Sequence, residues 1–333
     1  MTNRFISDQV IVITGASSGA GRVIALELAK YGGPLVLAGR NTHVLDEVAA
    51  ECQQSGAETL VVVTDVTDAG AVVRLAETAN EWKGRIDVWI NNAGVLAAGD
   101  FDKIPMDVNA RVVNTNLLGY MNGVHAVLPI FKRQQRGIII NNISIGGYLS
   151  VPYGAGYSAS KFGLRGFSEA LKGELASWKD IYVCDLYPGF LDTPGIQHAA
   201  NYTGRVLKPT PRVYDPRQLA VAIIEVIRNP RSSMYVGGAS IILKAVHAIF
   251  PELTAKIAGA IMRRYFKKAN GIATTNGNLF ETVDYNMSTS GGFPIVKATA
   301  EKKEYLAIGV LTGVALGLYL FGWHGKHSKA AVE

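Results

Sequence analysis

Through the first 240 residues, short apolar runs alternate with longer segments in which apolar side chains recur at helical spacing. The short runs are rich in β-branched residues and end in glycine or other turn residues, which is typical of buried strands. They lie at Val10–Ile13, at Leu35–Ala38, in a run that ends at Asp65, and within Ile86–Gly94, Gly137–Gly147 and Ile181–Thr193. The pattern predicts an open parallel sheet, whose ligands bind beyond the carboxyl ends of its strands.

A glycine-rich turn joins the first strand to the first helix. It contains Gly15, Ser17, Ser18, Gly19 and Gly21. Glycines let the backbone approach a pyrophosphate, and the N-terminus of the following helix offers free N–H groups. Ordinary tight turns use the same residues. A strand, glycine loop, helix and second strand within roughly thirty residues nevertheless favour dinucleotide binding.

The end of the second strand indicates which dinucleotide is bound. Arg40 stands where an NAD site usually carries a carboxylate for the ribose 2′-hydroxyl, and an arginine accommodates the 2′-phosphate of NADP. A solvated surface arginine is the alternative. We favour the phosphate role, and with it NADP(H) as the cofactor. Two roles are open for Asp65 at the end of the third strand: a hydrogen bond to the adenine amino group, and a helix cap or turn.

Tyr157 and Lys161 lie four residues apart in a helical segment, so their side chains share one face of the helix. A nearby cation favours the phenolate and lowers the pKa of a tyrosine from its reference of about 10. Such a phenol can exchange a proton with an alcohol oxygen. Ser144 comes at the carboxyl end of its strand, on the ligand-binding edge. A Tyr–Lys pair alone arises by chance on many helices, but together with the other segments it indicates an acid–base site.

Two further strand ends bring small residues to the same edge. Asn92 and Gly94 follow the fourth strand, where they let the backbone lie against a flat ligand. Pro188, Gly189 and Thr193 end a later strand, and Thr193 is able to reach a nicotinamide amide. Each piece alone is explained by a strand-end turn, whereas the ordered set is not.

These motifs resemble, in order and approximate spacing, those of the short-chain dehydrogenases/reductases. The likeness covers roughly residues 5–240 and rests on Thr14–Gly21, the NNAG segment, Ser144, Tyr157 with Lys161, and Pro188–Gly189 with Thr193. It implies one doubly wound α/β domain of Rossmann type, with a parallel sheet of seven strands and helices on both faces. It also implies hydride transfer between a nicotinamide and a carbonyl or alcohol carbon.

The resemblance assigns roles to single residues as well. It makes Tyr157 the general acid/base, Ser144 the group that orients the substrate oxygen, and Lys161 the ligand of the nicotinamide ribose that also lowers the pKa of Tyr157. Asn116 matches the helix asparagine that holds a water for the family's proton relay, although Asn114 lies only two residues away.

Past residue 240 the pattern changes. Residues 305–323 carry no charge, have an aromatic residue at each end and are flanked by lysines. Nineteen residues at 1.5 Å each suffice to cross ~30 Å of hydrocarbon. We predict a transmembrane helix here, with a buried C-terminal helix of the soluble core as the alternative. Its glycines would suit a partner helix and hence a homodimer: Gly309, Gly313 and Gly317.

Two linking segments separate residues 1–240 from this span. Residues 241–269 are amphipathic, broken by Pro251, and end in four basic residues. They suit a helix lying on anionic headgroups or, equally, a helix covering the sheet or the substrate cleft. Residues 270–302 are rich in Gly, Asn, Thr and Ser, and read as a tether or loosely ordered loop. The net charge of +6 gathers near this end, so we attribute it to membrane proximity and not to nucleic acid.

The N-terminal residues and the two cysteines indicate where in the cell the protein is expected. No apolar run precedes the first strand, so we expect no signal peptide. Cys52 and Cys184 suit reduced thiols in a cytosolic domain, and no metal site is indicated. We therefore expect a single-pass membrane protein with its catalytic domain on the cytosolic side.

Together these features predict a membrane-anchored, NADP(H)-dependent oxidoreductase. A lid between Gly195 and Pro216 should select a hydrophobic, lipid-like substrate through an apolar and aromatic set: Ile196, His198, Tyr202, Val206 and Tyr214. Three alternatives stay open: an NAD-dependent alcohol dehydrogenase of the same family, a catalytically silent cofactor-binding scaffold at a membrane, and a soluble oligomer whose terminal helix packs between subunits.

Overall fold

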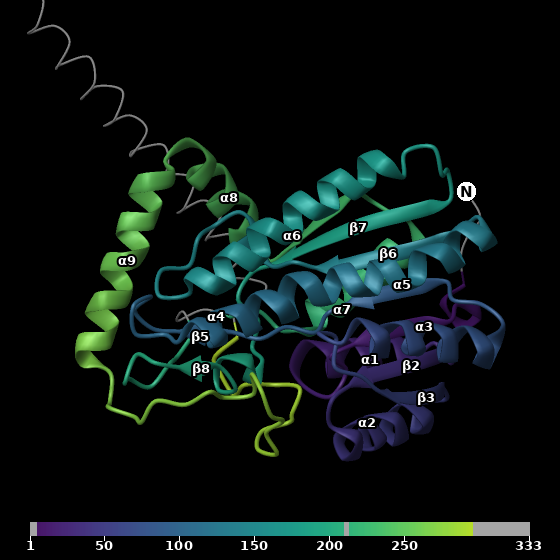
Figure 1. Cartoon of the computed structure of the whole chain (residues 1–333), viewed down its shortest axis with the longest axis horizontal. Helices are drawn as coiled ribbons and strands as arrows, with labels where there is room; N and C mark the ends of the chain where they lie inside the picture. The colour runs from purple at the N-terminus through teal and green to yellow at the C-terminus, as the bar shows by residue number, and fades with distance from the viewer. Residues whose placement is uncertain (1–4, 210–212, 296–333) are drawn as a thin grey trace, which may run out of the picture.

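The computed structural model describes residues 5–209 and 213–295 of the chain. Its centre is a parallel sheet of seven strands in the order β3-β2-β1-β4-β6-β7-β9 (Figure 1). The strands are β1 (Ile11–Thr14), β2 (Pro34–Gly39), β3 (Glu58–Val63), β4 (Val88–Asn91), β6 (Gly137–Asn142), β7 (Ile181–Pro188) and β9 (Ser233–Val236). The predicted seven-stranded parallel sheet is confirmed.

Helices cover both faces of this sheet. One face carries α1 (Gly19–Ala29), α2 (Thr42–Gln54) and α7 (Arg217–Arg228); the other carries α3 (Ala69–Lys83), α5 (Gly119–Gln134) and α6 (Ala155–Glu174), with α4 (Met106–Val113) against α6. Successive strand residues point to opposite faces. Ile11 and Ile13 of β1 therefore join the first apolar core, and Val12 joins the second.

Shorter elements complete the domain. A second, two-stranded sheet pairs β5 (Ala97–Ala98) with β8 (Ala200–Asn201). A π-helical turn at Asn114–Leu118 joins α4 to α5, and 3-10 turns lie at Ile6–Asp8, Ile145–Gly147 and Pro194–Ile196.

The strand order places a crevice at the carboxyl ends of β1 and β4. From β1 the chain moves outward to β2 and β3, and then returns to β4 on the other side of β1. Ligands of doubly wound sheets bind where the order reverses in this way. Most of the predicted site residues lie at the carboxyl ends of β1, β2, β3, β4, β6 and β7.

Two helices follow β9: α8 (Ala239–Ile249) and α9 (Pro251–Lys268). Pro251 is the first residue of α9, where a proline is tolerated because that position needs no N–H partner. Figure 1 shows α9 at the edge of the molecule, beside α4 and β5. It packs there through Phe266 on Tyr153, whose ring centroids lie 5.0 Å apart. Among the described residues no helix is long and apolar enough to cross a membrane, and the predicted span at 305–323 lies outside them.

The described part of the expected tether, residues 270–295, has neither helix nor regular strand, as a loop should. It is nevertheless held along the domain. It forms isolated antiparallel bridges from Gly271 to Arg205 and from Thr275 to Asn201, and Leu279 is fully buried in an apolar cluster with residues of β5, α4 and β8. Figure 1 shows this segment, in yellow-green, passing across the front of the sheet's ligand edge.

Candidate active site

A cavity of about 400 Å³ opens at the carboxyl edge of the sheet. It brings together all but one of the predicted site residues: Gly15, Ser17, Ser18, Gly19, Gly21, Arg40, Asp65, Asn92, Gly94, Ser144, Tyr157, Lys161, Pro188, Gly189 and Thr193. They come from the ends of six strands (β1, β2, β3, β4, β6 and β7) and from α6, which is the geometry that a parallel sheet imposes on strand-end residues.

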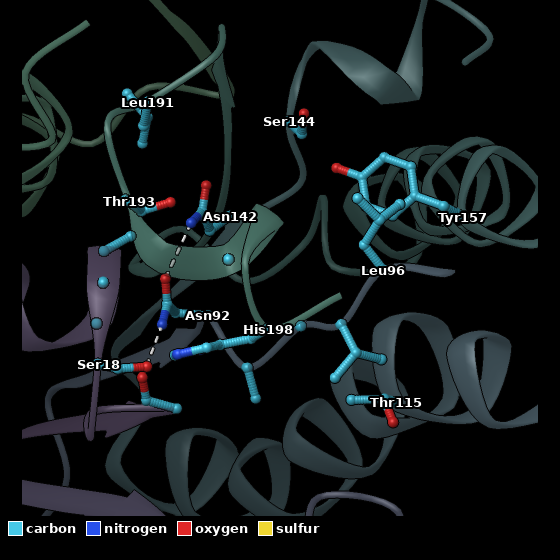
Figure 2. Close-up of a pocket in the computed structure, with 18 of the residues that line it drawn as sticks. Ser18, Asn92, Leu96, Thr115, Asn142, Ser144, Tyr157, Leu191, Thr193 and His198 are labelled. Atoms are coloured by element: carbon cyan, nitrogen blue, oxygen red, sulfur yellow. Dashed lines mark hydrogen bonds between the residues drawn. The ribbon is translucent and has the colours of Figure 1, made fainter. Parts of the chain in front are cut away.

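Ser144 and Tyr157 face one another across this cavity (Figure 2). The Ser144 Oγ and the Tyr157 hydroxyl oxygen each lie 3.6 Å from the position that a Cβ on Gly146 would take. Burial raises the pKa of Tyr157 above its usual value, and the hydrogen bond with Ser144 lowers it by a smaller amount. Tyr157 is therefore a protonated phenol at neutral pH, ready to donate.

Lys161 does not act on Tyr157 as the sequence predicted. Its Nζ lies 5.9 Å from the centre of the Tyr157 ring and donates to the carbonyl of Asn142 at 3.3 Å. Lys161 is itself only 4% exposed, and burial lowers its pKa to about 7. The predicted lowering of the tyrosine pKa is wrong for the protein alone, because desolvation outweighs a cation that is itself only weakly charged. A hydroxyl-bearing ligand beside Nζ would restore that charge.

Ser144 holds a strained backbone. Its φ of 91° lies in the left-handed region that favours glycine, and such a residue costs about 1–3 kcal/mol. The Ser144 Oγ accepts a hydrogen bond from Gly146 N at 3.2 Å, which helps to hold this turn. Strain of this kind persists only where the surrounding structure fixes it, and here it directs a hydroxyl into the cavity.

Asn116 is the one predicted catalytic residue that does not line the cavity. It is fully buried in the π-helical turn. Its Oδ1 accepts from Val95 N at 2.8 Å, and its Nδ2 donates to Val95 O at 2.9 Å and to Ser160 Oγ at 3.2 Å. With its side chain occupied in this way, Asn116 positions the loop after β4 and does not present its amide to a ligand.

Two positions of the glycine turn have no space for a side chain. A Cβ on Gly21 would lie 2.0 Å from Gly15 O, and a Cβ on Gly15 would lie 2.7 Å from Ala93 Cα. The turn is closed by Asn92, whose Nδ2 donates to Thr14 O at 3.1 Å and whose Oδ1 accepts from Asn142 Nδ2 at 3.0 Å. Gly15 and Gly21 are therefore required by the packing of the turn itself, and the turn so formed lines the cavity.

Arg40 and Asp65 lie at the far end of the cavity with Arg111, which the sequence reasoning did not single out. Arg111 forms an ion pair with Asp65 at 2.5 Å. Burial acts to raise the pKa of Asp65, but hydrogen bonds from Thr67 and Arg111 outweigh it and hold that pKa below its usual value. The helix α3 is capped by Asp68 and not by Asp65, which instead accepts from Thr67 N and shapes the preceding turn.

Arg40 is bound by the segment after α9. Its Nη1 donates to Leu279 O at 3.0 Å and its Nη2 donates to Asn278 O at 2.5 Å. It is thus not a free surface arginine: these bonds use two of its five N–H groups and leave three for a ligand in the cavity that it lines. No local signal in the sequence links position 40 to positions 278 and 279, so this contact could not be predicted.

Two asparagines of the cavity wall were also missed. Asn142 Oδ1 and Asn278 Oδ1 are buried and have no hydrogen-bond partner in the described structure. A buried polar atom without a partner is costly, and both residues line the cavity. Asn142 could have been found from its place at the end of β6, two residues before Ser144; Asn278 carries no such signal.

The predicted lid residues divide into two groups. Ile196 and His198 line the cavity, and His198 Nε2 lies 3.0 Å from Tyr285 O. Tyr202, Val206 and Tyr214 do not line it. Tyr214 is buried beneath Gly189 and Gly237, whose missing side chains make room for its ring.

The fold and this site together define an oxidoreductase of Rossmann type. Residues 9–202 match the family model described as short chain dehydrogenase. The chain therefore belongs to the short-chain dehydrogenase family, and it is an oxidoreductase that acts on CH–OH or C=O groups.

Known relatives agree with this assignment. The uncharacterized oxidoreductase YxnA of Bacillus subtilis is 34% identical over 77% of this chain and 73% of the relative. The 3-ketodihydrosphingosine reductase of Bacteroides thetaiotaomicron is 37% identical over 56% of this chain and 65% of the relative.

Solved structures of the same fold contain both kinds of dinucleotide. A short chain dehydrogenase/reductase from Burkholderia phymatum in complex with NAD superposes with a TM-score of 0.68, at 27% identity, over 75% of this chain and 96% of that one. An alcohol dehydrogenase from Thermococcus sibiricus complexed with 5-hydroxy-NADP gives 0.61, also at 27% identity, over 68% of this chain and 95% of that one.

Proposed function

We propose that this protein is an NADP(H)-dependent oxidoreductase for a hydrophobic carbonyl or alcohol substrate. The observation that carries the proposal is the pairing of Ser144 and Tyr157 in a cavity whose far end holds Arg40. The unpartnered Asn142 Oδ1 and the glycine cradle fit a dinucleotide in that cavity. When bound, the nicotinamide cofactor supplies or accepts the hydride.

The residues of the chain supply the proton and the orientation. In the reductive direction the Tyr157 hydroxyl donates a proton to the substrate oxygen, and in the oxidative direction it takes that proton back. The Ser144 hydroxyl donates a hydrogen bond to the same oxygen and keeps it within reach of Tyr157. Lys161, held by the Asn142 carbonyl, binds ribose hydroxyls and regains its charge near the phenol as it does so.

The choice of NADP(H) over NAD(H) rests on Arg40, and replacing it tests that choice. We expect Arg40→Asp to lower kcat/KM for NADPH about 100-fold, because charge-assisted hydrogen bonds to a phosphate are lost and a carboxylate repels it. The kcat/KM for NADH should be equal or higher, since a carboxylate suits the ribose 2′-hydroxyl. Initial rates with both cofactors would measure this. Arg74→Asp, an exposed arginine of α3 outside the cavity, is the control. An unchanged preference would contradict the assignment and favour the NAD-dependent alternative.

A hydrophobic substrate is supported by the apolar side chains around the reacting groups. Figure 2 places Leu96 beside the Tyr157 ring, and the cavity wall also includes Leu149, Val151 and Ile196. The relative from Bacteroides is named for a keto compound of the sphingosine type. An assay of detergent-solubilised protein with NADPH or NADH and a panel of long-chain ketones and aldehydes tests this part. If no compound in the panel is turned over, the catalytically silent scaffold would be favoured over the enzyme.

We also propose that the chain is anchored at a membrane through residues 305–323, with α9 lying on the bilayer surface. The outward side of α9 exposes Leu253, Ile257 and Ile261, which recur every four residues and so share one helix face. The basic residues at the end of α9 would suit anionic headgroups.

Deleting residues 302–333 tests the anchor. We expect the full chain to remain with membranes in alkaline carbonate and the shortened chain to be released, because nineteen uncharged residues are lost. NADPH binding, followed by cofactor fluorescence, should survive the deletion. Release of the full chain by carbonate would refute the anchor and favour the soluble oligomer, whereas loss of NADPH binding on deletion would refute the separation of the two parts.

A further inference from the structure

Residues 276–293, here called the clasp, run beside the cavity from Arg40 to the loop after β7. They lie outside the segment that matches the family model. Their contacts begin near β8, where Asn278 N donates to His198 O at 2.9 Å, and end beside the loop after β7, where Phe293 N donates to Asp192 Oδ1 at 2.9 Å. Both Asn278 and Phe293 line the cavity.

One end of the clasp is fixed at the arginine pair. The carbonyl of Leu279 accepts from Arg40 Nη1 and from Arg111 Nε, each at 3.0 Å. The Leu279 side chain is fully buried. Asn278, one residue earlier, keeps a buried side-chain oxygen without a partner at the cavity wall. A buried polar atom without a partner calls for an explanation, and a ligand in the cavity that Asn278 lines would supply one.

The middle of the clasp crosses the glycine turn. Ser288 O accepts from Gly19 N at 2.9 Å, and Met287 O accepts from Arg22 Nη1 at 2.7 Å. The clasp therefore passes directly over the start of α1, where the pyrophosphate of a dinucleotide is expected.

The other end is latched to a buried carboxylate. Asp192 is 2% exposed, and its two oxygens accept from Ser290 Oγ at 2.6 Å and from Phe293 N at 2.9 Å. Gly291 lies so close to the loop after β7 that a Cβ on it would stand 2.6 Å from Thr193 O. The latch thus ties the clasp to the loop that carries Thr193, on the nicotinamide side.

We propose that the clasp closes over the bound dinucleotide and limits its exchange, and that Asn278 is a further residue that contacts the cofactor. This inference rests on the proposed use of a dinucleotide. The cavity remains open beside the clasp, so we place the clasp over the ligand; the hydrogen bond from Gly19 N to Ser288 O is the one contact that a pyrophosphate would replace. Cofactor entry and departure then require the Asp192 latch to open.

Hydrogen–deuterium exchange of the full chain in detergent, with and without NADPH, tests the covering. We expect slower exchange in peptides spanning residues 276–293 when NADPH is bound. Faster exchange in those peptides would mean that the cofactor displaces the clasp, and would overturn the proposal. Unchanged exchange, with NADPH bound as judged by fluorescence, would also overturn it.

Stopped-flow displacement of NADPH by excess NADP+ tests the latch. We expect Ser290→Ala to raise the dissociation rate constant about tenfold, because a hydrogen bond to a buried carboxylate is lost. The association rate constant should rise as well, since a latch slows passage in both directions. Ser7→Ala is the matched control, because it removes an exposed serine–carboxylate hydrogen bond, from Ser7 Oγ to Asp8 at 3.0 Å. Equal rate constants for Ser290→Ala and wild type would refute the latch.

Asn278→Leu keeps the backbone carbonyl that holds Arg40 and removes the unsatisfied side-chain oxygen. We expect the Kd for NADPH to rise at least threefold, and an unchanged Kd would remove Asn278 from the site. The same titration on the wild-type chain separates the two proposals. Absence of NADPH and NADH binding would overturn the proposed function, whereas binding without protection of residues 276–293 would overturn the clasp alone.

Discussion

Tyr157→Phe should lower kcat by a factor of roughly 10² to 10⁴, the range that a positioned proton donor contributes. The ring remains, so its packing against the apolar cluster of β5, α4 and β8 is kept, while the hydroxyl that faces Ser144 is lost. NADPH affinity should change less than about threefold, because the hydroxyl serves the substrate oxygen. Steady-state rates and a fluorescence titration on the same preparation would measure both quantities.

The control for this change is Tyr182→Phe. Tyr182 lies near the start of β7, at the opposite end of the sheet from the cavity, and its hydroxyl donates to Asp180 at 3.4 Å. Near-normal turnover is expected for it. Equal turnover in Tyr157→Phe and wild type would exclude Tyr157 as the proton donor, and with it the mechanism proposed above.

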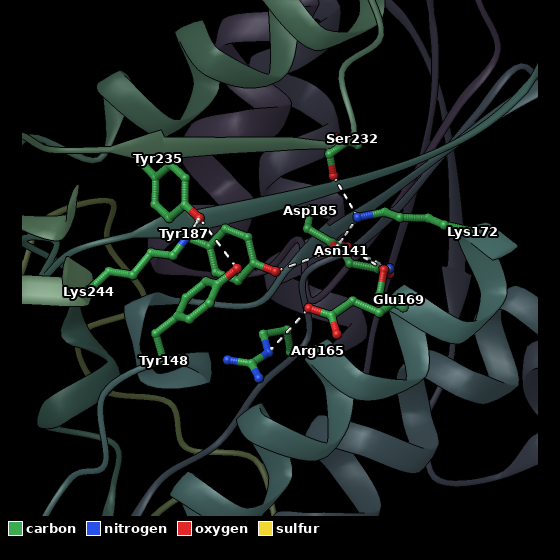
Figure 3. Close-up of polar contacts among 11 residues, drawn as sticks. Asn141, Tyr148, Arg165, Glu169, Lys172, Asp185, Tyr187, Ser232, Tyr235 and Lys244 are labelled. Carbon is green, nitrogen blue, oxygen red and sulfur yellow. Dashed lines mark hydrogen bonds and ion pairs between the residues drawn. The ribbon is translucent and has the colours of Figure 1, made fainter. Parts of the chain in front are cut away.

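The second large effect is on stability, at a buried carboxylate outside the cavity. Asp185 of β7 is completely buried (Figure 3). It accepts from Lys172 Nζ at 2.5 Å and from Ser168 Oγ at 2.5 Å, and Asn141 Nδ2 and the Tyr187 hydroxyl lie at 3.4 Å. Lys172 is the cation that compensates this charge, and its side chain is 24% exposed.

We expect Lys172→Met to lower the free energy of unfolding by about 3 kcal/mol, because it leaves a buried carboxylate without its counter-charge. Urea unfolding would measure this. Lys256→Met removes an exposed lysine–glutamate pair four residues apart on α9, and should cost less than about 0.5 kcal/mol. A second substitution, Asp185→Asn, should recover part of the loss in Lys172→Met. Equal costs for the two lysine variants would show that the Asp185 charge is not maintained by Lys172.

Most of the sheet could be predicted because local pattern and global fold agree. The apolar runs at Val10–Ile13 and Leu35–Ala38 correspond to β1 and β2 within one residue at each end. Strand ends then fix where Gly15, Asn92, Ser144 and Pro188 must lie, since all parallel strands end at one edge. The cavity that they line follows from this single constraint.

What could not be predicted depends on contacts between distant parts of the chain. Arg40 was expected to await a phosphate, but its partners are carbonyls some 240 residues later, and nothing at either position indicates the other. The pKa of Tyr157 depends on how much water the folded cavity excludes, which a helical spacing of four residues does not report. Residues 270–295 were expected to form a tether because their composition is that of a loop, and composition does not reveal where a loop is held.

The left-handed backbone at Ser144 has a consequence for how this sequence can change over time. Glycine adopts a φ of 91° without strain, so the single substitution Ser144→Gly would relieve the strain. Most proteins are only slightly more stable than they need to be, so a chain that did not use the hydroxyl would gain stability from this substitution. At position 144 stability therefore favours glycine, and only the hydroxyl that faces Tyr157 favours serine.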